Sequence, residues 1–254
     1  MSLPNIIHGS EQTIFKVRTS AQGAGNTPIG HKMVIEDGRT YRWTEMGATV
    51  GVNSRSYVAE VPTAADMANQ AIATLTASTT TPITVLTGIG STNTSFVVDE
   101  LKDGFVFIDS AANLNPGWNI VSNTAITAGA ATGTITIATA IVDDVAAAEQ
   151  VTFTKNPWKD IIIQPAPPAS MPVGVSVSVI AANGFGWTAT GGAVRCLSDT
   201  TPLEGDLVCT SVNVIGALMK AVAMETDGPA MGYTLVDQPD TETSLVHLNF
   251  DNIT

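Results

Sequence analysis

The residues that could carry chemistry are few and lie far apart in the sequence. The chain has three histidines, His8, His31 and His247, and none has a second ligand at metal-site spacing such as His-x-His or His-Glu-x-x-His. No Gly-x-Ser-x-Gly nucleophile motif occurs, and neither cysteine has a histidine nearby in sequence that would activate a thiolate. The sequence therefore predicts no catalytic residue, no metal ligand and no cofactor-binding residue.

Two groups of residues leave other chemistry open. Carboxylates cluster in three expected loops, where acids are usually solvated: Asp99, Glu100 and Asp103; Asp143 and Asp144; Asp237, Asp240 and Glu242. None has the spaced oxygen ligands and glycine of a calcium loop, although a glycosidase pair or a Ca²⁺ site stays open on residue type. The four tryptophans could form a carbohydrate platform, but in a β-rich chain they are more often core or interface anchors: Trp43, Trp118, Trp158 and Trp187.

The composition argues against two classes of partner. The formal net charge is −12, from 11 Lys and Arg against 23 Asp and Glu, so we expect no nucleic-acid binding. Apolar residues form short runs, none near the roughly 20 residues of a membrane helix, so we expect a soluble protein without a membrane partner. The opening residues lack the basic and apolar regions of a secretory signal, which predicts that the protein stays where it is made.

Residues 175–197 form the stretch around which the chain is organised. Valine alternates with serine over 175–179, which is typical of a strand with one apolar face. The Asn-Gly pair at 183–184 predicts a tight turn into a second strand. The Gly-Gly pair at 191–192 predicts a bulge or a close backbone approach in that strand.

The rest of the chain divides into four parts around this pattern. Residues 1–30 are predicted to be an N-terminal arm with one candidate strand at 13–19. Residues 31–76 hold a hairpin about an Asp-Gly turn and a short helix at 67–75, and are expected to pack with the C-terminal domain. Residues 77–155 form an inserted β-domain and residues 156–254 a C-terminal β-domain.

Short strands separated by turn signals recur through both β-domains. In the inserted domain they are expected at 83–87, 95–99, 104–109, 118–122, 134–140 and 150–154, and in the C-terminal domain at 160–164, 206–211, 214–222, 232–236 and 244–250. This spacing favours sandwiches or barrels. The predicted fold class is mainly β, with antiparallel β-sandwich or barrel domains, one short helix and an extended N-terminal arm.

The two cysteines flank a turn-rich segment. If that segment is a hairpin loop centred near Pro202, Cys196 and Cys209 face each other on antiparallel strands at a distance a disulfide can span. A reducing cytosol favours two buried free thiols. We therefore predict that both cysteines are reduced, buried and close in space.

Three C-terminal segments resemble the capsid decoration proteins of tailed phages, also called cement or head-stabilising proteins. These segments are GFGWTATGGAVRCL, EGDLVCTS and MGYTLVDQPDTETSLVHLNF, and they share a cadence of glycine and apolar positions with that family: Gly186, Trp187, Gly191, Gly192, Gly205, Val208, Met231 and Gly232. Residues 102–109 and 118–121 also resemble the inserted β-domain of the marine members.

The resemblance implies a non-enzymatic virion protein made in the bacterial cytoplasm. Such a protein binds the outside of an assembled capsid, with the major capsid protein and further copies of itself, commonly as a homotrimer, as its partners. The apolar residues Leu3, Ile6 and Ile7 are the expected capsid contact, because their segment is too short to bury them alone. A tail-tube or fibre-type β-protein of the same particle is the second reading. A carbohydrate-binding module is the third.

Overall fold

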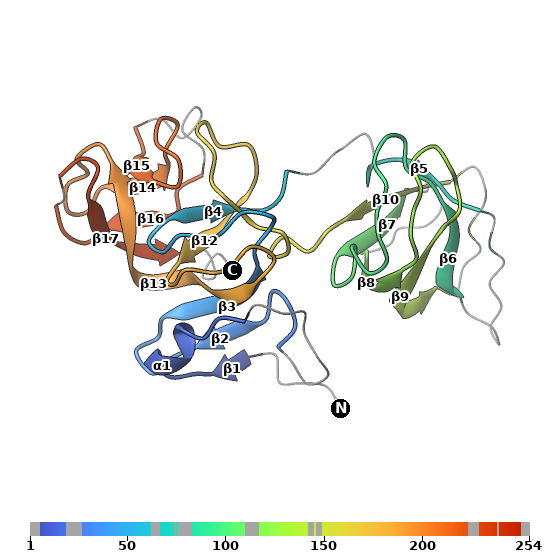
Figure 1. Ribbon diagram of the computed structural model, residues 1–254, viewed down its shortest axis with the longest axis horizontal. Coiled ribbons are helices and arrows are strands. Elements are labelled where there is room, and N and C mark those ends of the chain that lie inside the picture. The colour runs from blue at the N-terminus through green and yellow to red at the C-terminus, as the bar shows by residue number, and fades with distance from the viewer. Residues whose placement is uncertain are drawn as a thin grey trace. The chain divides into compact units, whose positions relative to one another are not determined.

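The chain folds into two compact units, each with its own sheet and core (Figure 1). The first unit consists of Met1–Val61 and Pro157–Thr254, and the second of Pro62–Asn156. The structure is a computed structural model, and it describes residues 6–18, 27–61, 67–73, 75, 83–109, 117–141, 145, 149–222, 229–237 and 239–249. The predicted mainly β fold is confirmed.

The described residues of the first unit form one 11-stranded sheet and a short helix, α1 (Glu11–Ile14). Its strands are β1 (Ile6–His8), β2 (Lys32–Val34), β3 (Thr40–Glu45), β4 (Ser56–Val58), β11 (Ile162–Ile163), β12 (Pro172–Ser176), β13 (Phe185–Asp199), β14 (Leu207–Thr210), β15 (Leu218–Lys220), β16 (Gly232–Thr234) and β17 (Thr243–Asn249). The hairpin predicted about the Asp-Gly turn is confirmed, because β2 and β3 pair antiparallel across it.

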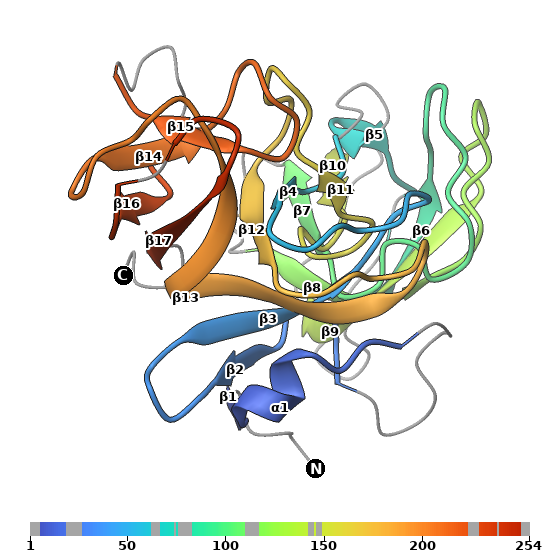
Figure 2. The ribbon, with the colours of Figure 1, turned by 60° about the vertical axis from the view of Figure 1, so that its left-hand side comes forward.

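Strand β13 is the longest element and belongs to two parts of this sheet. Its first half pairs with β3 and β12, and its second half pairs with β17 and β15. The pairings of β13 with β15, β15 with β14, β14 with β16, β16 with β17 and β17 with β13 close a five-stranded barrel. Figure 2 shows the strong bend by which β13 enters this barrel.

The bend falls at the predicted glycine pair. The register between β13 and β3 shifts between Ala189 and Gly191, and Gly192 has a φ of +84°, which glycine adopts without steric cost. The predicted bulge is therefore confirmed. The predicted turn at 183–184 is also present, since Asn183 has a positive φ, but it ends a connection longer than a tight hairpin.

The described part of the N-terminal segment is not the extended arm that we predicted. Strand β1 pairs in parallel with β2, Ile14 is buried in the first unit's core, and Arg18 exchanges two backbone hydrogen bonds with Phe185. Residues 13 and 14 belong to α1 and not to the expected strand at 13–19. Ile14 packs in the core because burying its apolar side chain gains more free energy than leaving the segment in solvent.

The second unit is an open, strongly curled antiparallel sheet of six strands. The strand order is β5 (Gln70–Ala71), β10 (Gln150–Thr154), β7 (Phe105–Asp109), β8 (Trp118–Asn123), β9 (Gly133–Ile141) and β6 (Ile83–Ile89). The curl brings the two edge strands together, and Ala73 N donates a hydrogen bond to Thr87 O at 3.0 Å. The concave side encloses a core of isoleucine, leucine, valine and phenylalanine side chains.

Two predictions for this region are wrong. The described residues 68–73 and 75 do not form the expected helix, because Gln70 and Ala71 form β5 and Leu75 bridges Val145. This segment also belongs to the second unit, which begins at Pro62 and not at residue 77, since Met67 and Ile72 pack in its core. Pairing with β10 and burial of these two side chains override a weak helix propensity.

Candidate functional site

The three predicted capsid contacts have different positions. Leu3 lies outside the described residues. Ile6 is 43% exposed on β1, whereas Ile7 is half-buried and packs against the first unit's core. Successive side chains of a strand point to opposite faces, so Ile6 and Ile7 cannot both reach one partner surface. Among the described members of this set, Ile6 alone is available for a contact.

Two further apolar side chains of the same segment are exposed, and we did not single them out from the sequence. Phe15, at the C-terminal end of α1, is 60% exposed, and Val17 is 42% exposed. The Cγ1 atom of Val17 lies near Gly186 of β13, so this part of the segment rests on the sheet. The alternation of apolar residues at 15 and 17 was the signal that could have found them. We call the three exposed apolar residues that this segment contributes, Ile6, Phe15 and Val17, the N-terminal apolar patch, a name that refers to their shared segment.

An ion-pair network fixes this segment to the β2–β3 turn. Nε of Arg39 donates to Asp37 Oδ2 at 2.6 Å, and a terminal nitrogen of Arg39 donates to Glu11 Oε1 at 2.7 Å. Partial burial opposes ionisation of Asp37, but hydrogen bonds from the Arg39 backbone and side chain lower the pKa of this carboxyl. The network joins α1 to a turn that lies 28 residues away in sequence.

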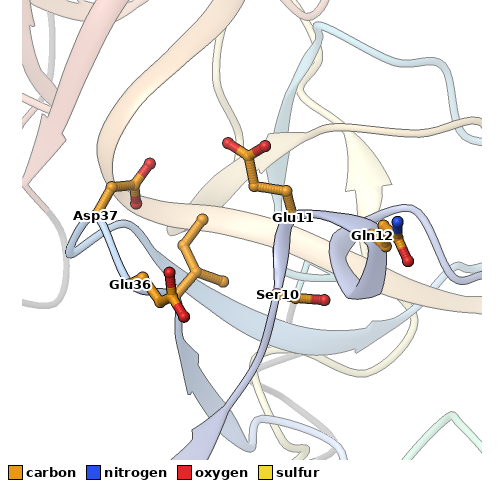
Figure 3. A pocket seen from close by; sticks show the side chains of 6 residues that line it. Ser10, Glu11, Gln12, Glu36 and Asp37 are labelled. Carbon is orange, nitrogen blue, oxygen red and sulfur yellow. The ribbon is translucent and has the colours of Figure 1, made fainter.

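Two shallow hollows lie beside this network. The first, of about 550 Å³, is lined by Ser10, Glu11, Gln12, Ile35, Glu36 and Asp37 (Figure 3). The second, of about 480 Å³, is lined by Asp37, Gly38, Arg39, Gly192, Ala193, Leu245 and His247. Both open beside carboxylates and one guanidinium, which are groups that hydrogen-bond to another polar surface.

The histidines do not gather into a site. His8 is on β1, His31 precedes β2, and His247 is on β17, where its ring stacks on Tyr233 at 5.0 Å between centroids. Within the described ranges, no group of three His, Cys, Asp or Glu side chains could hold a metal ion.

Three acids of the carboxylate clusters have protein partners. Glu100 forms an ion pair of 2.7 Å with Lys155. Asp240 accepts a hydrogen bond from the backbone of Thr200 at 2.9 Å, and Asp237 accepts one from the backbone of Glu204. Asp143 and Asp144 lie outside the described residues. Each of these three acids therefore binds a lysine or a backbone amide of its own unit.

The tryptophans do not form an exposed platform. Trp43 and Trp187 are buried together in the first unit, with ring centroids 4.9 Å apart. Trp118 and Trp158 are partly buried against the cores of the second and first unit respectively, and Arg42 lies over the Trp158 ring at 4.4 Å. All four act as core anchors.

The cysteines are free and buried, as predicted, but the hairpin that was to bring them together is wrong. Cys196 is on β13 and Cys209 on β14, and β15 lies between these strands in the sheet. Cys209 faces Met219 of β15, and Cys196 faces Ser244 of β17. Because β15 pairs in parallel with β13, β14 is not the antiparallel neighbour of β13 that the predicted hairpin required.

Comparisons of the chain with protein-family models, with curated proteins and with solved structures found no match. Among the residues that the structure describes, no helix has the length and apolar character needed to cross a membrane. The functional inference therefore rests on the residues and their geometry.

Proposed function

We propose that the protein is a non-enzymatic structural protein that binds the outer surface of a phage capsid and stabilises it by bridging capsomers. Its partners are the major capsid protein and further copies of itself, as a homotrimer on the virion exterior. The observation that supports this proposal is the N-terminal apolar patch. Three large apolar side chains stand in solvent on a segment that the protein itself holds in place.

The geometry of the segment suits attachment. Among the strands that the structure describes, β1 pairs with β2 alone, and we propose that its second edge accepts a strand of another chain. The Arg39 network and the burial of Ile14 hold the patch before binding, which lowers the conformational entropy lost on binding. The acidic hollow lined by Glu11, Glu36 and Asp37 includes residues of the same segment and offers polar contacts for the rim of such an interface.

Labelling of virus particles tests where on the particle the protein lies. Antibodies against this chain, coupled to gold, should label the heads of the phage that encodes it. Labelling confined to tails would overturn the capsid assignment and favour a tail-tube or fibre-type protein. Specific glycan binding, with no particle labelled, would favour the carbohydrate-binding module.

Point variants test the patch itself. Phe15→Ser combined with Val17→Ser should weaken binding to purified capsids by about tenfold or more, because most of the burial energy of a phenylalanine is lost. Ile215→Ser is the matched control, since Ile215 is also 60% exposed but belongs to another part of the first unit. Equal binding by both variants would exclude the patch as the attachment surface.

A further inference from the structure

The outer face of the second unit carries two phenylalanines that its core does not use. Phe105 and Phe107 are 41% and 37% exposed on β7, whereas Val106 and Ile108 between and beside them are buried. The alternation of a strand explains the arrangement, since odd-numbered residues of β7 point outward. Burial in the core of the unit therefore does not account for phenylalanine at these two positions.

The cross-strand neighbours of both rings are uncharged. Phe105 lies between Thr154 of β10 and Asn119 of β8, and Phe107 lies beside Thr152 of β10. The Phe107 ring also covers Gly117, where a Cβ would lie 2.8 Å from its Cδ1 atom. We call this surface the phenylalanine face; its members are Phe105, Phe107, Asn119, Val121, Thr152 and Thr154.

The phenylalanine face carries little charge in an acidic protein, because Asp109 at the end of β7 is the one charged residue that borders it in these strands. The strands from β6 to β10, all of whose residues are described, carry one charged residue, Asp109. This carboxylate accepts a hydrogen bond from Thr152 Oγ1 at 2.6 Å, at the end of β7. The chain as a whole has 23 acidic and 11 basic residues, so most of its charge lies elsewhere.

We propose that the phenylalanine face packs against the same face of a second copy of this chain, about a twofold axis. Two copies with a net charge of −12 repel each other, and this repulsion is least where the facing surfaces carry the fewest charges. A basic partner would be drawn to the acidic surfaces instead. A twofold axis places phenylalanine against phenylalanine, with threonine and asparagine side chains around them.

The contact is weak when it acts alone. Three strands span about 15 Å across and about 17 Å along, which is well below the roughly 800 Å² per partner of a standard interface. On one particle, where copies lie side by side, proximity raises the effective concentration and the weak contact forms. This role rests on the proposed function. The contact itself is a property of the isolated chain.

Sedimentation of the isolated chain from about 10 µM to about 1 mM tests the contact, since weak interfaces have dissociation constants in this range. A species of twice the starting mass should appear as the concentration rises. Higher salt should increase its fraction, because salt screens the repulsion between the acidic chains. Phe105→Ser with Phe107→Ser should reduce the association constant by about tenfold or more.

Two matched variants control for folding and for location. Asn119→Glu introduces a charge at an exposed position of the face and should abolish pairing, while an equimolar mixture with Asn119→Lys should restore it. Phe15→Ser, in the N-terminal apolar patch, should leave pairing unchanged. A chain that stays at its starting mass up to about 1 mM, pairing that Asn119→Glu does not alter, or a mixture that fails to pair would overturn the proposal. None of these results depends on capsid binding, so a failure of the proposed function is seen separately.

Discussion

Gly192 lies directly against Arg39 at the bend of β13. A Cβ atom at residue 192 would be 2.7 Å from Cγ of Arg39 and 3.1 Å from its Cα. The φ of Gly192 is also +84°, a conformation that residues with a side chain rarely adopt. This contact lets the Arg39 side chain reach Asp37 and Glu11 while β13 turns into the barrel.

Replacement of Gly192 by alanine is expected to lower the free energy of unfolding by about 2–4 kcal/mol, through backbone strain and the clash with Cγ of the Arg39 side chain. Gly205→Ala is the matched control, since Gly205 has a φ of +83° and no atom within 4 Å of its Cβ position. The control should cost only about 1 kcal/mol, the strain of a positive φ. Urea unfolding measures both values, and equal losses would show that the contact with Arg39 has no energetic effect.

Ser211→Ala is expected to cost about 1–3 kcal/mol, because it leaves a buried carboxylate without its closest donor. The hydroxyl of Ser211 donates to Asp199 Oδ2 at 2.5 Å and accepts from the backbone of Asn213 and Val214. Both Ser211 and Asp199 are buried. Thermal or urea unfolding measures the loss.

Ser244→Ala is the control for this prediction. Ser244 is equally buried, but its hydroxyl has no hydrogen-bond partner among the described residues. Removing an unsatisfied polar group should leave stability unchanged or raise it. A loss at Ser244 as large as that at Ser211 would contradict the assigned hydrogen bonds.

Alkaline pH should destabilise the protein through Cys196. Burial raises the pKa of this thiol to about 12, whereas an unfolded cysteine titrates near about 8.5. Below about pH 8.5 the thiol is neutral in both the folded and the unfolded protein, so its contribution to stability is fully present. As pH rises from there toward 12, only the unfolded cysteine ionises, and the free energy of unfolding falls by up to about 1.4 kcal/mol per pH unit. Tyr57, whose pKa burial also raises to about 12, adds to this loss only above about pH 10.

Urea unfolding at pH 8, 9 and 10 measures this effect in wild type and in Cys196→Ala. The variant should be about 1–2 kcal/mol less stable at neutral pH through lost packing, and should lose less stability as pH rises. Parallel pH profiles for the two proteins would show that Cys196 does not ionise on unfolding. Slow thiol labelling of the native protein, and rapid labelling in denaturant, should accompany the result.

Local sequence patterns determined much of the secondary structure. Alternation of apolar and polar residues decides which side chains can face a core, and β10 was predicted at its observed bounds for this reason. The Asp37-Gly38 turn and the Gly191-Gly192 bulge were also predictable, because glycine has conformations closed to other residues. The surface position of Ile6 was predicted from its apolar type in a short segment.

Apart from the β2–β3 hairpin, tertiary structure alone decided which strands became neighbours. The insertion of β15 between β13 and β14, the return of β1 to β2 and the strand at Gln70 and Ala71 all depend on partners distant in sequence. The alternation of side chains in a segment determines which face of the strand is apolar. It does not determine which strand pairs with it, because the backbone donors and acceptors along a strand edge can pair with any strand of suitable register. The sequence by itself therefore determined a mainly β chain with few reactive groups. The fold alone placed Phe15, Val17, Phe105 and Phe107 at the surface, since exposure depends on what the rest of the chain leaves uncovered.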